Sequence, residues 1–150
     1  SNVVPMFAVV VSVAVAVWLA VFLAARRDLG AGVLPSRDTA AAPCPLEPVF
    51  FEFDTTQVGD PARPILAKDA ECVQRSPQRG VLLTGHTDPR GTEEYNIALS
   101  ENRAQTVGDY LSRLGVDPAR FRFVPKGETE ATGTDEASWR QDRRVELEWQ

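Results

Sequence analysis

The 150-residue chain carries 16 Lys and Arg against 21 Asp and Glu, which gives a formal net charge of −5 and a sequence pI near 4.9. This acidic balance argues against nucleic acid as a partner, because phosphate binding needs a basic surface. With 43% hydrophobic and 25% charged residues, the chain has room for one globular domain and a short appendage.

The appendage is the apolar stretch over residues 3–25, which contains no charged side chain and ends at Arg26 and Arg27. As a helix that rises about 1.5 Å per residue, it would reach roughly 35 Å, enough to cross a bilayer. A cleaved signal peptide is the alternative, but the run is longer than a usual h-region and no small-x-small site follows it closely. We therefore expect one N-terminal transmembrane helix.

Residues 26–45 are small and proline-punctuated, so we expect a linker there and the globular domain over residues 46–150. Cys44 and Cys72 both lie outside the apolar run, and two cysteines in a small exported domain most often form one disulfide. Closing that loop would stabilise the domain by about 3–4 kcal/mol in the chain-entropy model. Free thiols in a reducing compartment are the alternative. The disulfide favours the periplasm, although the two arginines after the apolar run favour the cytoplasm.

The domain alternates strands and helices. The patterns predict strands over 48–54, 80–85, 120–125 and 143–149, helices over about 61–74 and 93–114, and a polar loop over 127–138. Gly115 ends the long helix. The order β-α-β-α-β-β predicts a layered α/β (α+β) sandwich with a mixed sheet, in which the last two strands add antiparallel pairing.

An arginine interrupts the apolar side of the long helix. At about 100° per residue, Arg103 falls within the arc of Leu99, Val107, Tyr110, Leu111 and Leu114. Such an arginine either reaches the rim as a snorkelling side chain or needs an anion. Asp88 leaves the C-terminal end of a buried strand, where ligands of α/β sheets tend to bind. If the two side chains do not form an ion pair with each other, they give the pocket one positive and one negative charge. Such a pocket suits a ligand with a carboxylate beside an ammonium group.

The stretch GHTDPRGTEEYNIALSENRAQTVGDYLSRLGV, with FEFD before it and DRRVELEW after it, resembles the OmpA-like C-terminal domain over about residues 48–149. That family is a peptidoglycan-binding module. The resemblance implies that Asp88 of GHTD and Arg103 of LSENRA hold the diaminopimelate residue of a peptide stem. It also implies ligand contacts by Phe53, Asp54, Thr87, Asn96 and Leu99. The family often has Asn where Asp142 precedes the terminal Arg-Arg-Val.

Catalysis and metal binding are not expected. His86 is the only histidine, so a zinc hydrolase lacks ligands, and we expect its side chain to support the fold through a hydrogen bond. Asp88 with Glu93 or Glu94 could resemble the two catalytic carboxylates of a glycosidase, but nothing in the sequence positions them on opposite sides of a sugar-binding cleft. For Trp139, packing is expected over carbohydrate stacking. We expect no enzyme activity and no cofactor.

The expected function is non-covalent binding of peptidoglycan by a membrane-anchored protein, which tethers the envelope of a Gram-negative bacterium to its cell wall. The helix over residues 3–25 would lie in the inner membrane, with the domain in the periplasm. The alternative is a wall-anchoring subunit of a stator, transport or secretion complex, with other envelope proteins as partners. Residues 3–25 contain no ionisable group, which argues against ion conduction by this chain alone.

Overall fold

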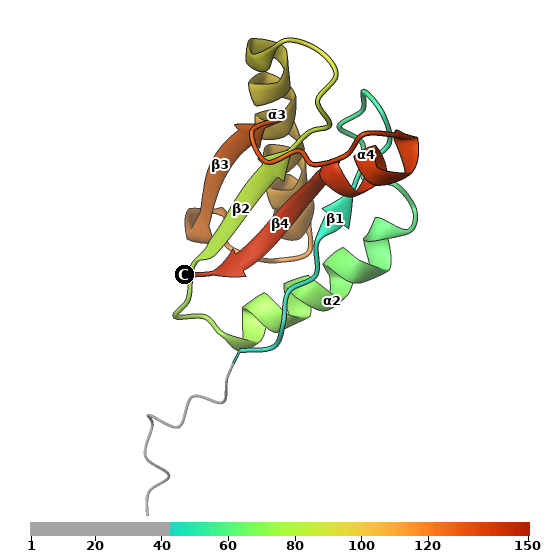
Figure 1. Cartoon of the computed structure of the whole chain (residues 1–150). Helices are drawn as coiled ribbons and strands as arrows, with labels where there is room; N and C mark the ends of the chain where they lie inside the picture. Colours follow the sequence, from blue (N-terminus) through green and yellow to red (C-terminus); the bar gives the residue numbers. More distant parts are fainter. Residues whose placement is uncertain (1–42) are drawn as a thin grey trace, which may run out of the picture. The chain divides into compact units, whose positions relative to one another are not determined.

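The computed structural model describes residues 43–150. The expected transmembrane helix over residues 3–25 and nearly all of the expected linker lie outside the described residues. Among residues 43–150, none of the helices combines the length and apolarity that a bilayer crossing requires. The elements are β1 (Val49–Phe50), α2 (Ala62–Arg75), β2 (Val81–His86), α3 (Glu93–Arg113), the 3₁₀ turn η1 (Pro118–Arg120), β3 (Phe121–Gly127), α4 (Glu136–Asp142) and β4 (Arg144–Trp149) (Figure 1).

The four strands form one sheet in the order β1-β4-β2-β3 (Figure 1). Strand β3 runs parallel to β2, with Val81 opposite Phe121, whereas β4 is antiparallel to both β1 and β2. The predicted mixed sheet with helices is therefore confirmed. The expected pairing of the last two strands was partly wrong, because β4 lies between β1 and β2 and supplies all the antiparallel pairing of the described sheet.

One face of the sheet and the two long helices form the core. Val81 and Leu83 of β2 and Val145 and Leu147 of β4 are buried, as the two-residue period of a strand requires. Helices α2 and α3 cover that face with Leu66, Val73, Ala104, Val107 and Leu111. Leu114, expected on the apolar side, is 38% exposed because it follows the last turn of α3.

Gly85 lets α3 approach β2 closely. A Cβ atom at Gly85 would lie 2.1 Å from the backbone oxygen of Ser100, which neither element can relieve without moving. We expect Gly85→Ala to lower the free energy of unfolding by roughly 2–3 kcal/mol in urea titrations, because of this overpacking. Gly80→Ala is the matched control, since the nearest atoms to its new Cβ lie 3.4 Å away. Equal stability of the two variants would contradict the prediction.

Two elements differ from the predicted ones. Helix α4 occupies part of the stretch expected as a loop, and a capping box between Asp135 and Ser138 begins it. Strand β1 has two residues in place of the seven predicted over 48–54. The chain leaves the sheet after Phe50 because the carbonyls of Glu52 and Thr55 accept hydrogen bonds from Arg103, as described below.

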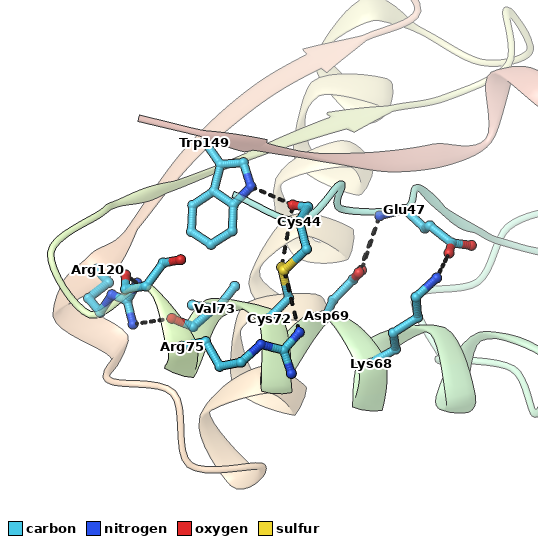
Figure 2. The surroundings of a disulfide bond; sticks show 10 residues. Cys44, Glu47, Lys68, Asp69, Cys72, Val73, Arg75, Arg120 and Trp149 are labelled. Atoms are coloured by element: carbon cyan, nitrogen blue, oxygen red, sulfur yellow. Dashed lines mark hydrogen bonds and ion pairs between the residues drawn. A yellow bond between two sulfur atoms is a disulfide. The ribbon is translucent and has the colours of Figure 1, made fainter. Parts of the chain in front are cut away.

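The start of the described chain is fastened to α2 and to the last strand (Figure 2). Cys44 and Cys72 form a disulfide with their Cα atoms 6.1 Å apart. The indole nitrogen of Trp149 donates to the carbonyl of Cys44 at 2.9 Å, and the backbone nitrogen of Glu47 donates to the carboxylate of Asp69 at 3.3 Å. The segment that leads into β1 is therefore held covalently and by hydrogen bonds from two elements.

Asp69 makes this junction sensitive to pH. It is fully buried, and burial raises the pKa of its carboxyl from 3.8 to about 6. The folded state therefore holds this proton more tightly than the unfolded state. The resulting stabilisation is complete below about pH 3.8 and is lost as the pH rises through 6.

We expect Asp69→Asn to remove this dependence. Relative to the variant, the parent should lose roughly 2 kcal/mol of unfolding free energy between pH 4 and pH 7, because each pKa unit is about 1.4 kcal/mol and the loss has already begun at pH 4. Urea titrations across that range measure the difference. Asp60→Asn, at an exposed position, removes the same charge and should follow the parent. A constant difference between parent and Asp69→Asn would contradict the assignment.

Candidate ligand-binding site

A cavity of about 230 Å³ opens where β2 ends and α3 begins. All seven residues that the resemblance implied as ligand contacts line it: Phe53, Asp54, Thr87, Asp88, Asn96, Leu99 and Arg103. Arg90, Gly91, Tyr95 and Arg143 line it as well. The structure thus brings together residues from the loop after β1, the loop between β2 and α3, the first half of α3 and the position before β4.

Arg103 is completely buried, and backbone carbonyls hold it from three sides. Its Nε donates to Thr55 O at 2.9 Å, Nη1 to His86 O at 3.3 Å and Nη2 to Glu52 O at 3.0 Å. These bonds leave N–H groups available on both Nη atoms. Burial, helped by the nearby charge of Arg143, lowers the pKa of Arg103 to about 10, so the guanidinium stays charged at neutral pH.

Arg103 also explains why β1 is short. The carbonyls of Glu52 and Thr55 point to its guanidinium and not to a neighbouring strand. Between them Asp54 has a φ of 52°, in the left-handed region that aspartate tolerates better than most residues. The loop after β1 is therefore shaped around a side chain of α3.

Asp88 is buried and already has two arginine partners. Arg90 binds it in a bidentate manner, with Nε donating to Oδ1 at 3.2 Å and Nη2 donating to Oδ2 at 2.7 Å. Nη1 of Arg143 also donates to Oδ2, at 3.1 Å. Burial works to raise the pKa of Asp88, but the hydrogen bonds from Arg90 and Arg143 outweigh it and hold the pKa below its ordinary value. Within residues 43–150, no ion pair joins Asp88 to Arg103.

The loop that carries Asp88 leads directly into α3. The backbone nitrogen of Arg90 donates to Asp88 Oδ1 at 3.1 Å, which is an Asx turn, and Gly91 follows with a φ of 117° that favours glycine. Thr92 then caps α3 by accepting the backbone N–H of Tyr95 at 3.2 Å. The Asx turn, the glycine with positive φ and the helix cap together explain the sequence TDPRGTEE between β2 and α3.

Arg90 lies between two aromatic rings at the rim of the cavity. Its guanidinium carbon is 4.0 Å from the ring centroid of Phe53 and 4.4 Å from that of Trp139. Its Nη2 also lies 3.3 Å from a carboxylate oxygen of Glu136. Trp139, expected to pack in the core or at an edge, packs on this arginine and donates its indole N–H to Gly133 O at 3.0 Å.

Three further side chains bring polar groups to the cavity. The Oγ1 of Thr87 is buried and has no hydrogen-bond partner, although the residue is only 2% exposed. Asn96 donates its amide to Glu128 and to the carbonyl of Arg90. Tyr95, whose hydroxyl donates to Asp54, has a raised pKa because that hydrogen bond favours the neutral phenol.

Two expectations outside the cavity need correction or completion. The expected hydrogen bond from the His86 side chain was wrong: both ring nitrogens are buried without a partner, and Glu130 and Glu146 lie 3.6 and 3.7 Å away. Burial lowers the pKa of the His86 side chain, and the backbone carbonyl of His86 accepts a hydrogen bond from Arg103.

Asp142 accepts the backbone N–H groups of residues 132 and 133 at 3.1 and 2.9 Å, so it orders the loop before α4 and does not line the cavity.

Arg90, Tyr95 and Arg143 lie in the stretches that resemble the family but were not among the expected ligand contacts, although the sequence contained a signal for two of them. Tyr95 precedes Leu99 and Arg103 by four and eight residues, so it shares their helix face. Arg143 precedes Val145 by two residues and shares its buried face of the last strand. Arg90 had no such signal.

The cavity has an excess of positive charge. Asp54 and Asp88 oppose Arg90, Arg103 and Arg143, so three positive charges minus two negative ones leave one positive charge. This occurs in a chain whose net charge is −5. Because buried guanidinium groups need anions, the arrangement favours a ligand with a carboxylate.

Comparison with known proteins identifies similar sequences and similar folds. A peptidoglycan-associated lipoprotein of Pseudomonas aeruginosa is 48% identical over 100 residues, which cover 65% of this chain and 59% of that protein's length. The crystal structure of the peptidoglycan-associated lipoprotein from Burkholderia pseudomallei superimposes with a TM-score of 0.66 and 44% identity, over 69% of this chain and 89% of that one. The C-terminal domain of Helicobacter pylori MotB, at 21% identity and a TM-score of 0.65, shares the fold. The model of the OmpA family matches residues 50–145, and the chain belongs to that family.

Proposed function

We propose that this chain binds peptidoglycan non-covalently through the diaminopimelate residue of its stem peptide. Arg103 would take a carboxylate of that residue, and Asp88 would take its ammonium group. The domain over residues 46–150 would thereby attach the chain to the cell wall. The relatives that carry the name peptidoglycan-associated lipoprotein support the wall as the target.

Arg103 is the observation that carries the proposal. A buried guanidinium normally has a carboxylate partner, yet carbonyls alone hold this one within the described part of the chain. The N–H groups left over belong to a residue that lines the cavity. A ligand carboxylate supplies the missing anion, and the unpartnered hydroxyl of Thr87 supplies a further hydrogen bond.

Attachment to a membrane completes the proposed tether. Residues 3–25 have the length and apolarity of a transmembrane helix, and we propose that they anchor the chain in the inner membrane with the domain in the periplasm. The curated relatives are named lipoproteins, which indicates a lipid anchor in those proteins. No observation favours a subunit of a stator or transporter, because the similarity to MotB at 21% identity concerns the fold alone.

Binding without catalysis is the chemistry that the cavity supports. Its arginines are engaged with Asp88 or with carbonyls, Asp54 accepts the hydroxyl of Tyr95, and together these side chains present both positive and negative charge to a ligand. His86, the only histidine of the chain, has its ring outside the residues that line the cavity. We therefore propose a binding module.

Sedimentation with purified cell-wall sacculi tests the proposal. The 150-residue chain, kept in mild detergent, should sediment with sacculi that contain diaminopimelate, and free meso-diaminopimelate should release it. Sacculi with lysine in that position lack one carboxylate and should retain much less protein. Equal retention on both kinds of sacculi would contradict recognition of diaminopimelate, and no retention on either would contradict the proposed function.

A further inference from the structure

Arg90 occupies the place on Asp88 that a cationic ligand group would need. We propose that Arg90 is an internal counter-ion of Asp88, which the ammonium group of the ligand must replace. Arg90 would thereby act as a residue that determines specificity. This inference rests on the proposed function and adds a residue that was not among the predicted ligand contacts.

The contacts of Asp88 show why an exchange is needed. Oδ1 accepts from the backbone nitrogen and from Nε of Arg90, and Oδ2 accepts from Nη2 of Arg90 and Nη1 of Arg143. Asp88 is 4% exposed, so the surrounding protein leaves little room for a third cation. An incoming ammonium group therefore reaches the carboxylate only where one of the two arginine side chains gives way.

Arg90 and not Arg143 is the side chain that can move. The Arg143 side chain is 1% exposed and is fixed by Phe51 O at 3.0 Å as well as by Asp88. The Arg90 side chain is 34% exposed and lies at the rim of the cavity. Its link to Asp88 spans only two residues of a turn.

Glu136 offers Arg90 a second position. The carboxylate of Glu136, at the start of α4, already lies 3.3 Å from Nη2 of Arg90. About half of the Glu136 side chain is exposed to solvent. The guanidinium can release Asp88, keep Glu136 and remain between Phe53 and Trp139. The exchange then replaces one cation on Asp88 by another and leaves no buried charge unpaired.

The exchange affects only ligands that carry a positive charge. A ligand that carries only a carboxylate satisfies Arg103 but leaves Arg90 in place on Asp88. A ligand with a carboxylate and an ammonium group at the same end satisfies both sites. Arg90 therefore lowers the affinity for ligands whose cation must reach Asp88, and it leaves the affinity for ligands with a carboxylate alone unchanged.

Two synthetic peptides test this inference on the 150-residue chain by calorimetric titration in mild detergent. One is L-Ala-γ-D-Glu-meso-diaminopimelate, and the other ends in 2-aminopimelate and lacks the distal amino group. We expect Arg90→Gln to bind the first peptide about tenfold more tightly than the parent, which corresponds to removal of one competing ion pair. Its affinity for the second peptide should change less than about twofold.

Two further variants complete the design. Arg140→Gln removes the same charge from α4, where Arg140 also pairs with Glu136, and should leave both affinities unchanged. Arg90→Lys keeps the charge without the fork and should lie between the parent and Arg90→Gln. Weaker or unchanged binding of the first peptide by Arg90→Gln, with a binding parent, would overturn the role of Arg90 alone. A parent that binds neither peptide nor sacculi would overturn the proposed function as well.

Discussion

Arg103→Ala is expected to lower the free energy of unfolding by about 4 kcal/mol and to abolish sedimentation with sacculi. The substitution removes a charged donor from three carbonyls that lie on two separate segments, the loop after β1 and the end of β2. Each carbonyl left without a partner in a buried site costs about 1–3 kcal/mol, and part of that cost is recovered when water enters the vacated space.

Urea unfolding measures the loss of stability, and sedimentation is then compared at a temperature where the variant remains folded. Arg113→Ala, in the last turn of the same helix and exposed, is the matched control and should leave both properties unchanged. Arg103→Lys keeps a positive charge but lacks the planar fork, so we expect it to recover part of the stability and little of the binding. A folded Arg103→Ala that still sediments like the parent would show that the ligand carboxylate lies elsewhere.

Arg103 also accounts for one part of the fold that the sequence pattern predicted wrongly, the length of β1. Periodicity predicted α3 to within one residue at its C-terminal end, and alternation predicted β2 and β4, because these elements bury a regular pattern of apolar side chains. Strand β1 was predicted too long, since the carbonyls that would have extended its pairing bind Arg103, a contact between residues about 50 positions apart. Helix α4 was missed because its seven residues bury only Asp142 and show no apolar period.

For the site, the seven residues that the resemblance implied as ligand contacts all line one cavity, and their contacts with a ligand stay a prediction. The sequence did not show how their charges are distributed. Asp88 and Arg103 were expected to share the ligand between them, and the partners of Asp88 were not foreseen. One of them, Arg143, lies 55 residues away, so only the tertiary fold brings the two together. Local turn geometry brings in the other, Arg90.

Asp88→Asn should show the second large effect. The substitution keeps the shape of the side chain but removes the carboxylate that lies 3.1 Å from Nη1 of Arg143, so the buried guanidinium keeps only Glu136, 3.0 Å from its Nη2, as a carboxylate partner. Removing one partner of a buried ion pair costs about 3–5 kcal/mol where the remaining charge is uncompensated. Because Glu136 still compensates part of the charge of Arg143, we expect a loss at the lower end of that range, about 3 kcal/mol. Binding to sacculi should also be lost, since the ligand ammonium group loses its acceptor.

The pH dependence of this loss separates charge from packing. Because the folded pKa of Asp88 lies below its ordinary value of 3.8, its stabilising contribution is present above that pH and disappears as the pH falls through the folded pKa. The difference in unfolding free energy between the parent and Asp88→Asn should therefore be largest near pH 7 and shrink below about pH 4. Asp109→Asn, on the exposed side of α3, removes one carboxylate without touching an arginine of the cavity and should track the parent throughout. A difference that stays constant from pH 7 to pH 3 would mean that Asp88 stabilises the domain by its packing and hydrogen bonds alone, and that the charge of the cavity must be balanced by another group.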